Sequence, residues 1–301
     1  MGTLRAIDFF GIPQQHEKVQ TKGSQYQVSI SYGINLSDRV FLGAGVGITS
    51  LDFTSRKTYS ETFPSNKPLN SMILAENLHT SGSGINLTLG AIYKPIDFFQ
   101  VGFSVATPTL YALNDSYSAA MSSDWRNFPY GTPNLPAGPI ATDQLLTSYS
   151  LNTPWRVSGG LTFFVLKHGF ISADIDYIGY GSSHYSSQTN GVDLSGDNAD
   201  IKDAYRSLFN YRIGAEYRWK QFRLRGGYSL MPDQYKSVQN DVDSKIESFS
   251  GGVGYRATKF YIDLTAIFPQ GNTWYKPYSI APTVTTQNKT TTVMVTVGFP
   301  F

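Results

Sequence analysis

The chain has 301 residues, among them 20 tyrosines, 19 phenylalanines and 28 glycines, while only 15% of its residues are charged. The absence of cysteine excludes disulfides, thiolate chemistry and sulfur-rich metal sites. A net charge of +2 without a run of basic residues argues against a nucleic-acid partner. No stretch of the sequence approaches the ~18 apolar residues that a membrane-spanning helix needs.

From residue 25 onward, apolar and polar residues alternate with a period of two, which is typical of β-strands with two different faces. In the first such segment Tyr26, Val28 and Ile30 share one face, and Gln25 and Gln27 lie on the other. No clear helical periodicity separates the segments, so the sequence predicts an all-β chain. The eleven predicted strands are residues 25–36, 40–49, 85–93, 99–105, 154–164, 170–180, 208–219, 222–230, 247–256, 260–268 and 291–301.

The last predicted strand shows the alternation most clearly. Val293, Val295 and Val297 share a face with Phe299 and Phe301, and the opposite face is small and polar. This pattern is typical of a strand between lipid and a lumen, although an edge strand of a soluble sandwich would also give it. A strand that ends on an aromatic residue also resembles the signal that the outer-membrane barrel-assembly machinery reads, so we expect Phe299 and Phe301 to form an assembly signal.

The predicted connections between strands alternate between short and long. Transmembrane barrels place short turns at one end and long loops at the other, whereas a soluble up-and-down barrel has no reason to do so. The short turns are residues 35–39, 94–97, 166–169, 220–221 and 256–259, and the long loops are residues 53–82, 108–152, 181–207, 231–246 and 269–290.

Aromatic residues cluster at both ends of the predicted strands, as in the two aromatic girdles of a membrane barrel. Those near the short turns are Tyr93, Phe99, Phe163, Phe170, Tyr217, Trp219, Phe222, Tyr255, Phe260, Phe299 and Phe301, and those near the long loops are Tyr26, Trp155, Tyr177, Phe209, Tyr211, Tyr228, Phe249 and Phe268. We therefore predict an antiparallel transmembrane β-barrel.

Eleven strands is an odd number, whereas single-chain barrels of this type have an even number and no open edge. We therefore expect the first part of the barrel to be absent from this sequence. The opening MGTLRAIDFFGIP has no charged segment followed by an apolar core, so it does not read as a signal peptide. Residues 1–24 are expected to be an N-terminal segment, either an outer loop or a remnant of an earlier strand, and residues 25–301 the barrel strands with long outer loops.

Several segments, in this order and spacing, resemble the FadL/TodX-type family of outer-membrane transporters for long-chain fatty acids and other hydrophobic compounds. They are YGINLSDRVFLGAGVGI at 32–48, LGAIYKPIDFFQVGFSVATPTLY at 89–111, NTPWRVSGGLTF at 152–163, ISADIDYIGYGS at 171–182, YRIGAEYRW at 211–219, FRLRGGYSL at 222–230 and FSGGVGYRATKFYIDL at 249–264.

The resemblance implies a fourteen-stranded barrel plugged by an N-terminal hatch, through which hydrophobic molecules pass and leave sideways near an early, kinked strand. The signal peptide, the hatch and the first three strands of that family have no counterpart in this sequence. The gating residues of the family therefore cannot be assigned to positions here.

Charged residues on the polar phase of the middle strands are the candidate ligand-binding residues of the lumen. Arginine matches carboxylate geometry with two parallel hydrogen bonds, so they could hold the carboxylate of a fatty acid. Opposite charges also alternate across neighbouring strands, and we favour a cross-strand ladder that braces the lumen. The candidates are Arg156, Asp174, Asp176, Arg212, Glu216, Arg223 and Arg225, and Arg218 and Asp263 share their phase.

The sequence does not favour an enzyme. The one local combination of histidine and serine is His184 with Ser182 and Ser183, and no spacing links it to an acid. The glycines of GAGVG at 43–47 lack phosphate-loop spacing. We expect no catalytic residues, no metal and no cofactor.

The loop at 108–152 is rich in proline and aromatic residues, and Trp125, Phe128 and Tyr130 are candidate residues of a hydrophobic capture surface at the barrel mouth. An ordered surface loop is the alternative. The predicted function is energy-independent uptake of hydrophobic compounds such as long-chain fatty acids across the outer membrane of a Gram-negative bacterium. A water-filled porin and a non-transporting structural or adhesin barrel are the alternatives.

The expected partners follow from that function. They are outer-membrane lipid and lipopolysaccharide, hydrophobic or amphiphilic small molecules and the barrel-assembly machinery, with no nucleic acid. We expect the protein to be a monomer.

Overall fold

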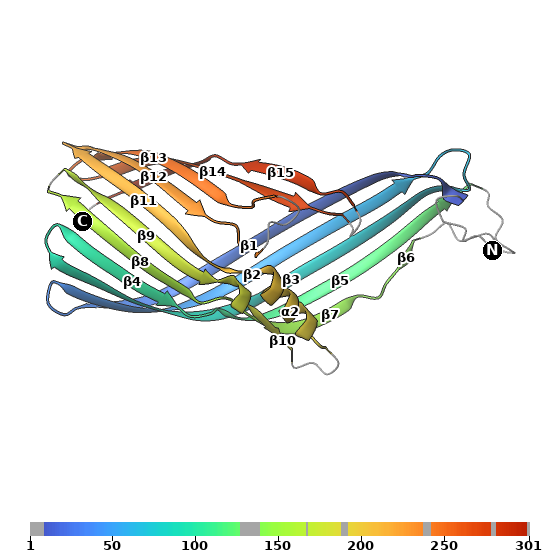
Figure 1. Cartoon of the computed structure of the whole chain (residues 1–301), viewed down its shortest axis with the longest axis horizontal. Coiled ribbons are helices and arrows are strands. Elements are labelled where there is room, and N and C mark those ends of the chain that lie inside the picture. The colour runs from blue at the N-terminus through green and yellow to red at the C-terminus, as the bar shows by residue number, and fades with distance from the viewer. Residues whose placement is uncertain are drawn as a thin grey trace.

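The chain forms one large antiparallel β-sheet in a computed structural model, which describes residues 9–126, 139–166, 168–187, 192–236, 242–277 and 281–299. The sheet curls into a barrel-like body, and part of it continues outward as a long arm (Figure 1). This confirms the predicted all-β, antiparallel fold. No helix in these ranges is long and apolar enough to cross a membrane.

Many consecutive strands pair with each other, and β11 to β15 follow one another in the sheet without a break. The strands are β1 (Gln14–Asn35), β2 (Val40–Thr62), β3 (Leu69–Ile96), β4 (Phe99–Ala106), β5 (Leu110–Trp125), β6 (Ile140–Ala141), β7 (Leu145–Asn152), β8 (Arg156–Val165), β9 (Gly169–Gly179), β10 (His184–Ser186), β11 (Ser207–Trp219), β12 (Phe222–Met231), β13 (Ile246–Arg256), β14 (Tyr261–Tyr275), β15 (Val284–Lys289) and β16 (Thr292–Gly298). A 3-10 turn, η1 (Tyr180–Ser182), and a helix, α2 (Ser195–Ala204), lie between β9 and β11.

Each of the eleven predicted strands overlaps a strand of the structure, and the five predicted short turns join strands as expected. The order around the body is β1, β2, β3, β4, β8, β9, β11, β12, β13, β14 and β16.

Four of the predicted long loops are wrong, because they contain strands; the loop at 181–207 contains β10 as well as α2. Residues 53–62 and 69–82 extend β2 and β3, the loop at 108–152 contains β5, β6 and β7, and the loop at 269–290 contains the end of β14 and β15. Residues 14–24, assigned from sequence to the N-terminal segment, form the outer half of β1. The outer parts of β1, β2 and β3, together with β5 and β6, build the arm on the right of Figure 1.

Two interruptions separate the arm from the body. Along its length β3 pairs with β5 up to Ile85 and with β4 from Thr88 onward. The chain segment between β4 and β5 contains Pro108. The neighbouring β7 and β8 are separated at Pro154. Proline lacks an N–H group and breaks a ladder. Two hydrogen bonds between threonines bridge these breaks. The Thr109 N–H donates to the Thr153 hydroxyl (2.8 Å), and the Thr153 N–H donates to the Thr109 carbonyl (3.1 Å).

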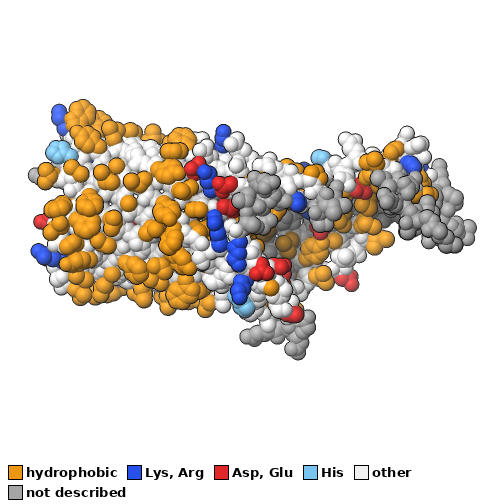
Figure 2. Space-filling view, in the orientation of Figure 1, with side chains coloured by type: hydrophobic (Ala, Val, Ile, Leu, Met, Phe, Trp, Pro, Cys, Tyr) orange, Lys and Arg blue, Asp and Glu red, His pale blue; other side chains and the backbone are white. Residues whose placement is uncertain are grey.

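The ladder register confirms that the apolar positions form one continuous outer face. Apolar residues pair with apolar residues around the body, as in Val46 with Leu87, Val101 with Leu161, Leu224 with Val253, and Leu264 with Val295. Figure 2 shows these side chains crowded over the body, with charged side chains gathered in a band beside them. Such a face is stable against lipid rather than water.

Aromatic residues border this apolar face at both ends. At the short-turn end the rings of Trp219, Phe222 and Tyr255 follow one another at 6.1 and 5.5 Å, and at the outer end Tyr177 lies 5.3 Å from Phe209. Ten residue steps separate Phe209 from Trp219. At ~3.4 Å per residue and a tilt of ~40°, the band is about 26 Å tall, close to the ~25 Å of membrane barrels.

The two edges of the curled sheet face each other without pairing. β1 pairs with β2 alone and β16 with β14 alone among the described strands. The outer ends do meet, because the Tyr275 hydroxyl donates a hydrogen bond to the Glu17 carboxylate, 258 residues away. Glu17 in turn forms an ion pair with Lys57 (3.4 Å). This bond therefore clasps the two edges together at Glu17 and Tyr275, and within the described residues no backbone ladder joins β1 to β16.

Candidate functional site

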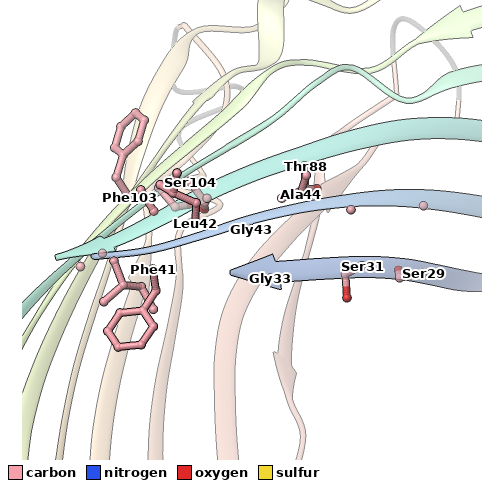
Figure 3. Close-up of a pocket in the computed structure, with 18 of the residues that line it drawn as sticks. Ser29, Ser31, Gly33, Phe41, Leu42, Gly43, Ala44, Thr88, Phe103 and Ser104 are labelled. Atoms are coloured by element: carbon pink, nitrogen blue, oxygen red, sulfur yellow. The ribbon is translucent and has the colours of Figure 1, made fainter. Parts of the chain in front are cut away.

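The inner face of the sheet carries a groove of about 830 Å³ along β1, β2, β3, β4 and β8, which reaches Asp174 and Asp176 of β9 and Arg212 of β11 (Figure 3). Small and neutral polar residues line most of it, because every second position of these strands is glycine, serine, threonine or an amide. The inward residues include Ser29, Ser31, Gly43, Gly45, Asn86, Thr88, Ser104 and Ser158. Ser31 and Phe41 lie on one side of the sheet in Figure 3, and Phe103 lies on the other.

The groove changes character along its length. Phe41 pairs with Ile92 near the short turns and makes that end apolar. At the outer end Thr49, which is 1% exposed, donates its hydroxyl to the Gly84 carbonyl (3.1 Å). Tyr111 is also buried there and accepts a hydrogen bond from Gln25 (2.9 Å). Two buried side chains, each with its own hydrogen bond, therefore lie at the outer end of these strands.

The opposite wall, built by β9 and β11–β14, carries the charges. Arg225 is the centre of the larger cluster, because its guanidinium bonds both Glu216 (Nε–Oε2, 2.8 Å) and Asp263 (Nη1–Oδ1, 2.8 Å). Arg218 bonds the other oxygen of Glu216 (2.7 Å), and Arg256 bonds Asp263 (2.9 Å). Five charged side chains from four strands thus form one chain of ion pairs.

A smaller cluster lies where the charged wall meets the neutral groove. Arg212 bonds Asp176 at 2.5 Å, and Asp176 is 4% exposed. The Arg212 side chain is 49% exposed and lines the groove. Asp174 lines the groove beside it. Arg212 is the predicted lumenal arginine that is best placed to meet a ligand.

Two glycines make room for these long side chains. A Cβ atom at Gly160 would lie 2.4 Å from Asp174 Oδ1, and one at Gly254 would lie 2.3 Å from Asp263 Oδ1. Both distances are far below van der Waals contact. The charged side chains therefore lie flat across glycines of the neighbouring strands.

Two of the predicted lumenal residues are not in either cluster. Arg223 donates to the backbone carbonyls of Lys220 and Phe222 (both 2.8 Å) and caps the short turn between β11 and β12. Arg156 lies at the outer end of β8 and is exposed. The other five candidates, together with Arg218 and Asp263, lie on the charged wall.

The predicted mouth residues are placed elsewhere or lie outside the described residues. Trp125 is at the far tip of the arm, where its ring packs 6.0 Å from Phe10. Phe128 and Tyr130 lie outside the described residues, as does Phe301. Phe299 is described and is 71% exposed.

The local serines near His184 have backbone partners. Ser182 donates its hydroxyl to the Gly179 carbonyl (2.8 Å) and Ser183 to the Tyr180 carbonyl (3.1 Å). His184 lies in β10, paired with Asn152. These hydroxyls close the turn after β9.

Sequence reasoning did not single out the amides of the groove. Gln27 and Asn86 approach each other above Gly47, and Asn86 donates to the Thr109 hydroxyl (3.0 Å). Their polar phase was visible in the sequence. Their contact depends on the register between β1, β2 and β3, which a single sequence does not specify.

Comparison with known proteins identifies the fold. No protein-family model matches the chain, and no curated protein matches it. Among solved structures, the CymD monoaromatic hydrocarbon channel is similar with a TM-score of 0.50 and 13% identity, over 95% of this chain and 87% of that one. The toluene transporter TbuX of Ralstonia pickettii is similar with a TM-score of 0.52 and 14% identity, over 93% and 68%. At these identities the likeness shows that the chain has the fold of such channels.

Proposed function

We propose that the chain is the barrel part of an outer-membrane channel for energy-independent uptake of hydrophobic compounds. One observation carries the proposal: a continuous apolar outer face surrounds an inner groove lined mostly by small, neutral residues, with Asp174 and the paired Asp176 and Arg212 at one side. The outer face suits lipid, and the groove suits a solute that needs no charged partner. The fold shared with hydrocarbon and toluene channels supports this reading.

The ion pairs of the lumen favour uncharged solutes. Glu216 and Asp263 each bond two guanidinium groups, so their charges are already compensated. A neutral ring or alkyl chain could pass the small residues of the groove without disturbing these bonds. Small neutral aromatic compounds are therefore our first choice of substrate, and long-chain carboxylates are the second.

The proposal also requires the seam between β1 and β16 to be closed in the membrane. Unpaired backbone groups in hydrocarbon cost several kcal/mol each, which an open edge cannot sustain. We propose that further strands fill this seam, as expected for a fourteen-stranded barrel. The clasp between Tyr275 and Glu17 would hold the outer ends in position for that pairing.

Uptake and conductance together test the function. Outer-membrane vesicles that contain the protein should take up radiolabelled toluene faster than vesicles without it, while excluding sucrose. Planar bilayers should show little steady conductance. Large, stable ohmic channels that admit sucrose, without faster toluene uptake, would instead identify a porin.

Arg212 offers a test of carboxylate recognition. We expect Arg212→Met to weaken binding of laurate by the ~1.5–3 kcal/mol of a charge-assisted hydrogen bond, which is roughly ten- to 150-fold. Arg212→Lys keeps the charge and should lose less. Equilibrium binding of radiolabelled laurate to the purified protein measures both. Unchanged affinity in Arg212→Met would show that the carboxylate is held elsewhere.

A further inference from the structure

A second cavity, separate from the lumenal groove, lies at the outer ends of β12, β13, β14 and β15. Its volume is about 540 Å³, within the range of small-molecule sites. A cavity of only ~150 Å³ can hold benzene. Its lining includes Met231, Tyr235, Ser244, Ile246, Trp274 and the amide side chain of Asn272.

The lining of this cavity combines aromatic, apolar and amide side chains. Tyr235 and Trp274 present aromatic rings 6.3 Å apart, and Met231 and Ile246 add apolar surface. Amide groups supply hydrogen bonds, and none of the described lining residues is charged. Aromatic walls favour another ring, in stacked or edge-on geometry. The absence of charge from the described lining favours a neutral molecule.

The aromatic wall is fixed before any ligand arrives. The buried Asp233 carboxylate accepts hydrogen bonds from the N–H groups of Tyr235 (3.0 Å) and Ser244 (3.2 Å), which ties together both ends of the segment between β12 and β13. The Tyr235 ring is stacked on Tyr205 at 5.2 Å. Arg206 donates to the Asp233 carbonyl (2.9 Å) and joins this segment to the start of β11. A preformed site loses less entropy on binding.

The neighbouring tyrosine also stays neutral. Burial, and then the adjacent Tyr235, raises the pKa of the Tyr205 hydroxyl above its usual value. The Tyr205 hydroxyl behind the Tyr235 ring therefore adds no charge over the physiological pH range.

We propose that this cavity is an outer binding site for small neutral aromatic compounds, with the ligand's ring packed against Tyr235 and Trp274 and any hydroxyl on the amides. The choice of ligand class rests on the proposed function. The site itself is distinct from the groove, since β1–β4 contribute nothing to it. It would concentrate solute at the outer opening.

Binding of 4-fluorobenzyl alcohol to the purified full chain, followed by 19F NMR titration, tests the site. Trp274→Ala should weaken binding about tenfold, as expected for loss of an aromatic wall. Ser244→Trp should abolish binding by filling the cavity, because Ser244 uses its backbone N–H rather than its side chain to bond Asp233. Trp219→Ala, at the opposite end of the body, is the matched control and should bind as wild type.

Each result decides the proposal. Wild-type affinity in both cavity variants would overturn the site, as would binding of glucose in preference to the aromatic probe. Loss of binding in both, with unchanged heat-modifiable mobility of the folded protein, would support it. The experiments also distinguish failure of this site from failure of the proposed transport. Aromatic binding at this cavity without toluene uptake would refute transport and keep the site. Toluene uptake together with wild-type aromatic binding in both cavity variants would support transport and refute the site.

Discussion

Leu87→Arg is expected to destabilise the folded barrel by ~2–4 kcal/mol, the cost of a cation on the lipid face near mid-membrane. Leu87 lies on the outer face of β3, opposite Val46, and half of its surface is exposed. The guanidinium would have to remain in hydrocarbon or distort the bilayer. Urea titration of the protein in phospholipid vesicles, followed by tryptophan fluorescence, measures the free energy of unfolding.

The adjacent residue provides the control. Thr88 points to the groove, where there is room for a long side chain, so Thr88→Arg should remain within about 1 kcal/mol of wild type. Equal destabilisation by the two substitutions, or a larger loss for Thr88→Arg, would mean that the two faces are wrongly assigned.

Arg225→Met should destabilise the barrel by ~2–3 kcal/mol, because Glu216 and Asp263 each lose one of two guanidinium partners in a poorly solvated lumen. The side chain of Arg225 is 32% exposed, so water replaces part of the loss. The same urea titration measures the change. Combining Arg225→Met with Glu216→Gln should cost less than the sum of the two, since the neutral amide needs no cation.

Arg223 is the matched control on the same strand. Its guanidinium caps an exposed turn through backbone carbonyls, so Arg223→Met should cost less than about 1 kcal/mol. Similar losses for Arg223→Met and Arg225→Met would show that the ion-pair chain does not contribute specifically to stability.

The strands of the body could be predicted from sequence because two different environments act on alternate residues. Lipid selects apolar side chains on one face, and the narrow lumen selects small or polar ones on the other, as Val46 and Gly47 show. The arm lacks this contrast. In its strands, as at Thr54–Tyr59, polar and charged residues fall on both faces, so the period of two disappears. Helix α2 was also missed, since none of its residues is buried and no apolar stripe marks it.

The charged wall was predictable in part. A residue's place on the polar face of a strand predicts that its side chain lies in the lumen, but not which side chain it pairs with. Glu216 and Arg225 are neighbours in the ladder between β11 and β12, a register that the short turn at 220–221 makes predictable. Arg223 lies on the same face of β12, but it is close enough to the turn to donate a hydrogen bond to the Lys220 carbonyl instead. The outer cavity could not be predicted, because its walls come from separate segments whose meeting depends on the β13–β14 and β14–β15 registers and on the Tyr205–Tyr235 stack.

The most direct test of the central claim, a strand wall with lipid on one side and a solute pathway on the other, uses spin labels along β3. The chain has no native cysteine, so single cysteines at residues 85–93 can each be labelled alone and examined in lipid vesicles. Collisions with lipid-soluble oxygen should peak at Ile85, Leu87, Leu89 and Ala91, and collisions with a water-soluble nickel chelate at Asn86, Thr88 and Gly90. Reversed phases, or accessibility without alternation, would contradict the account.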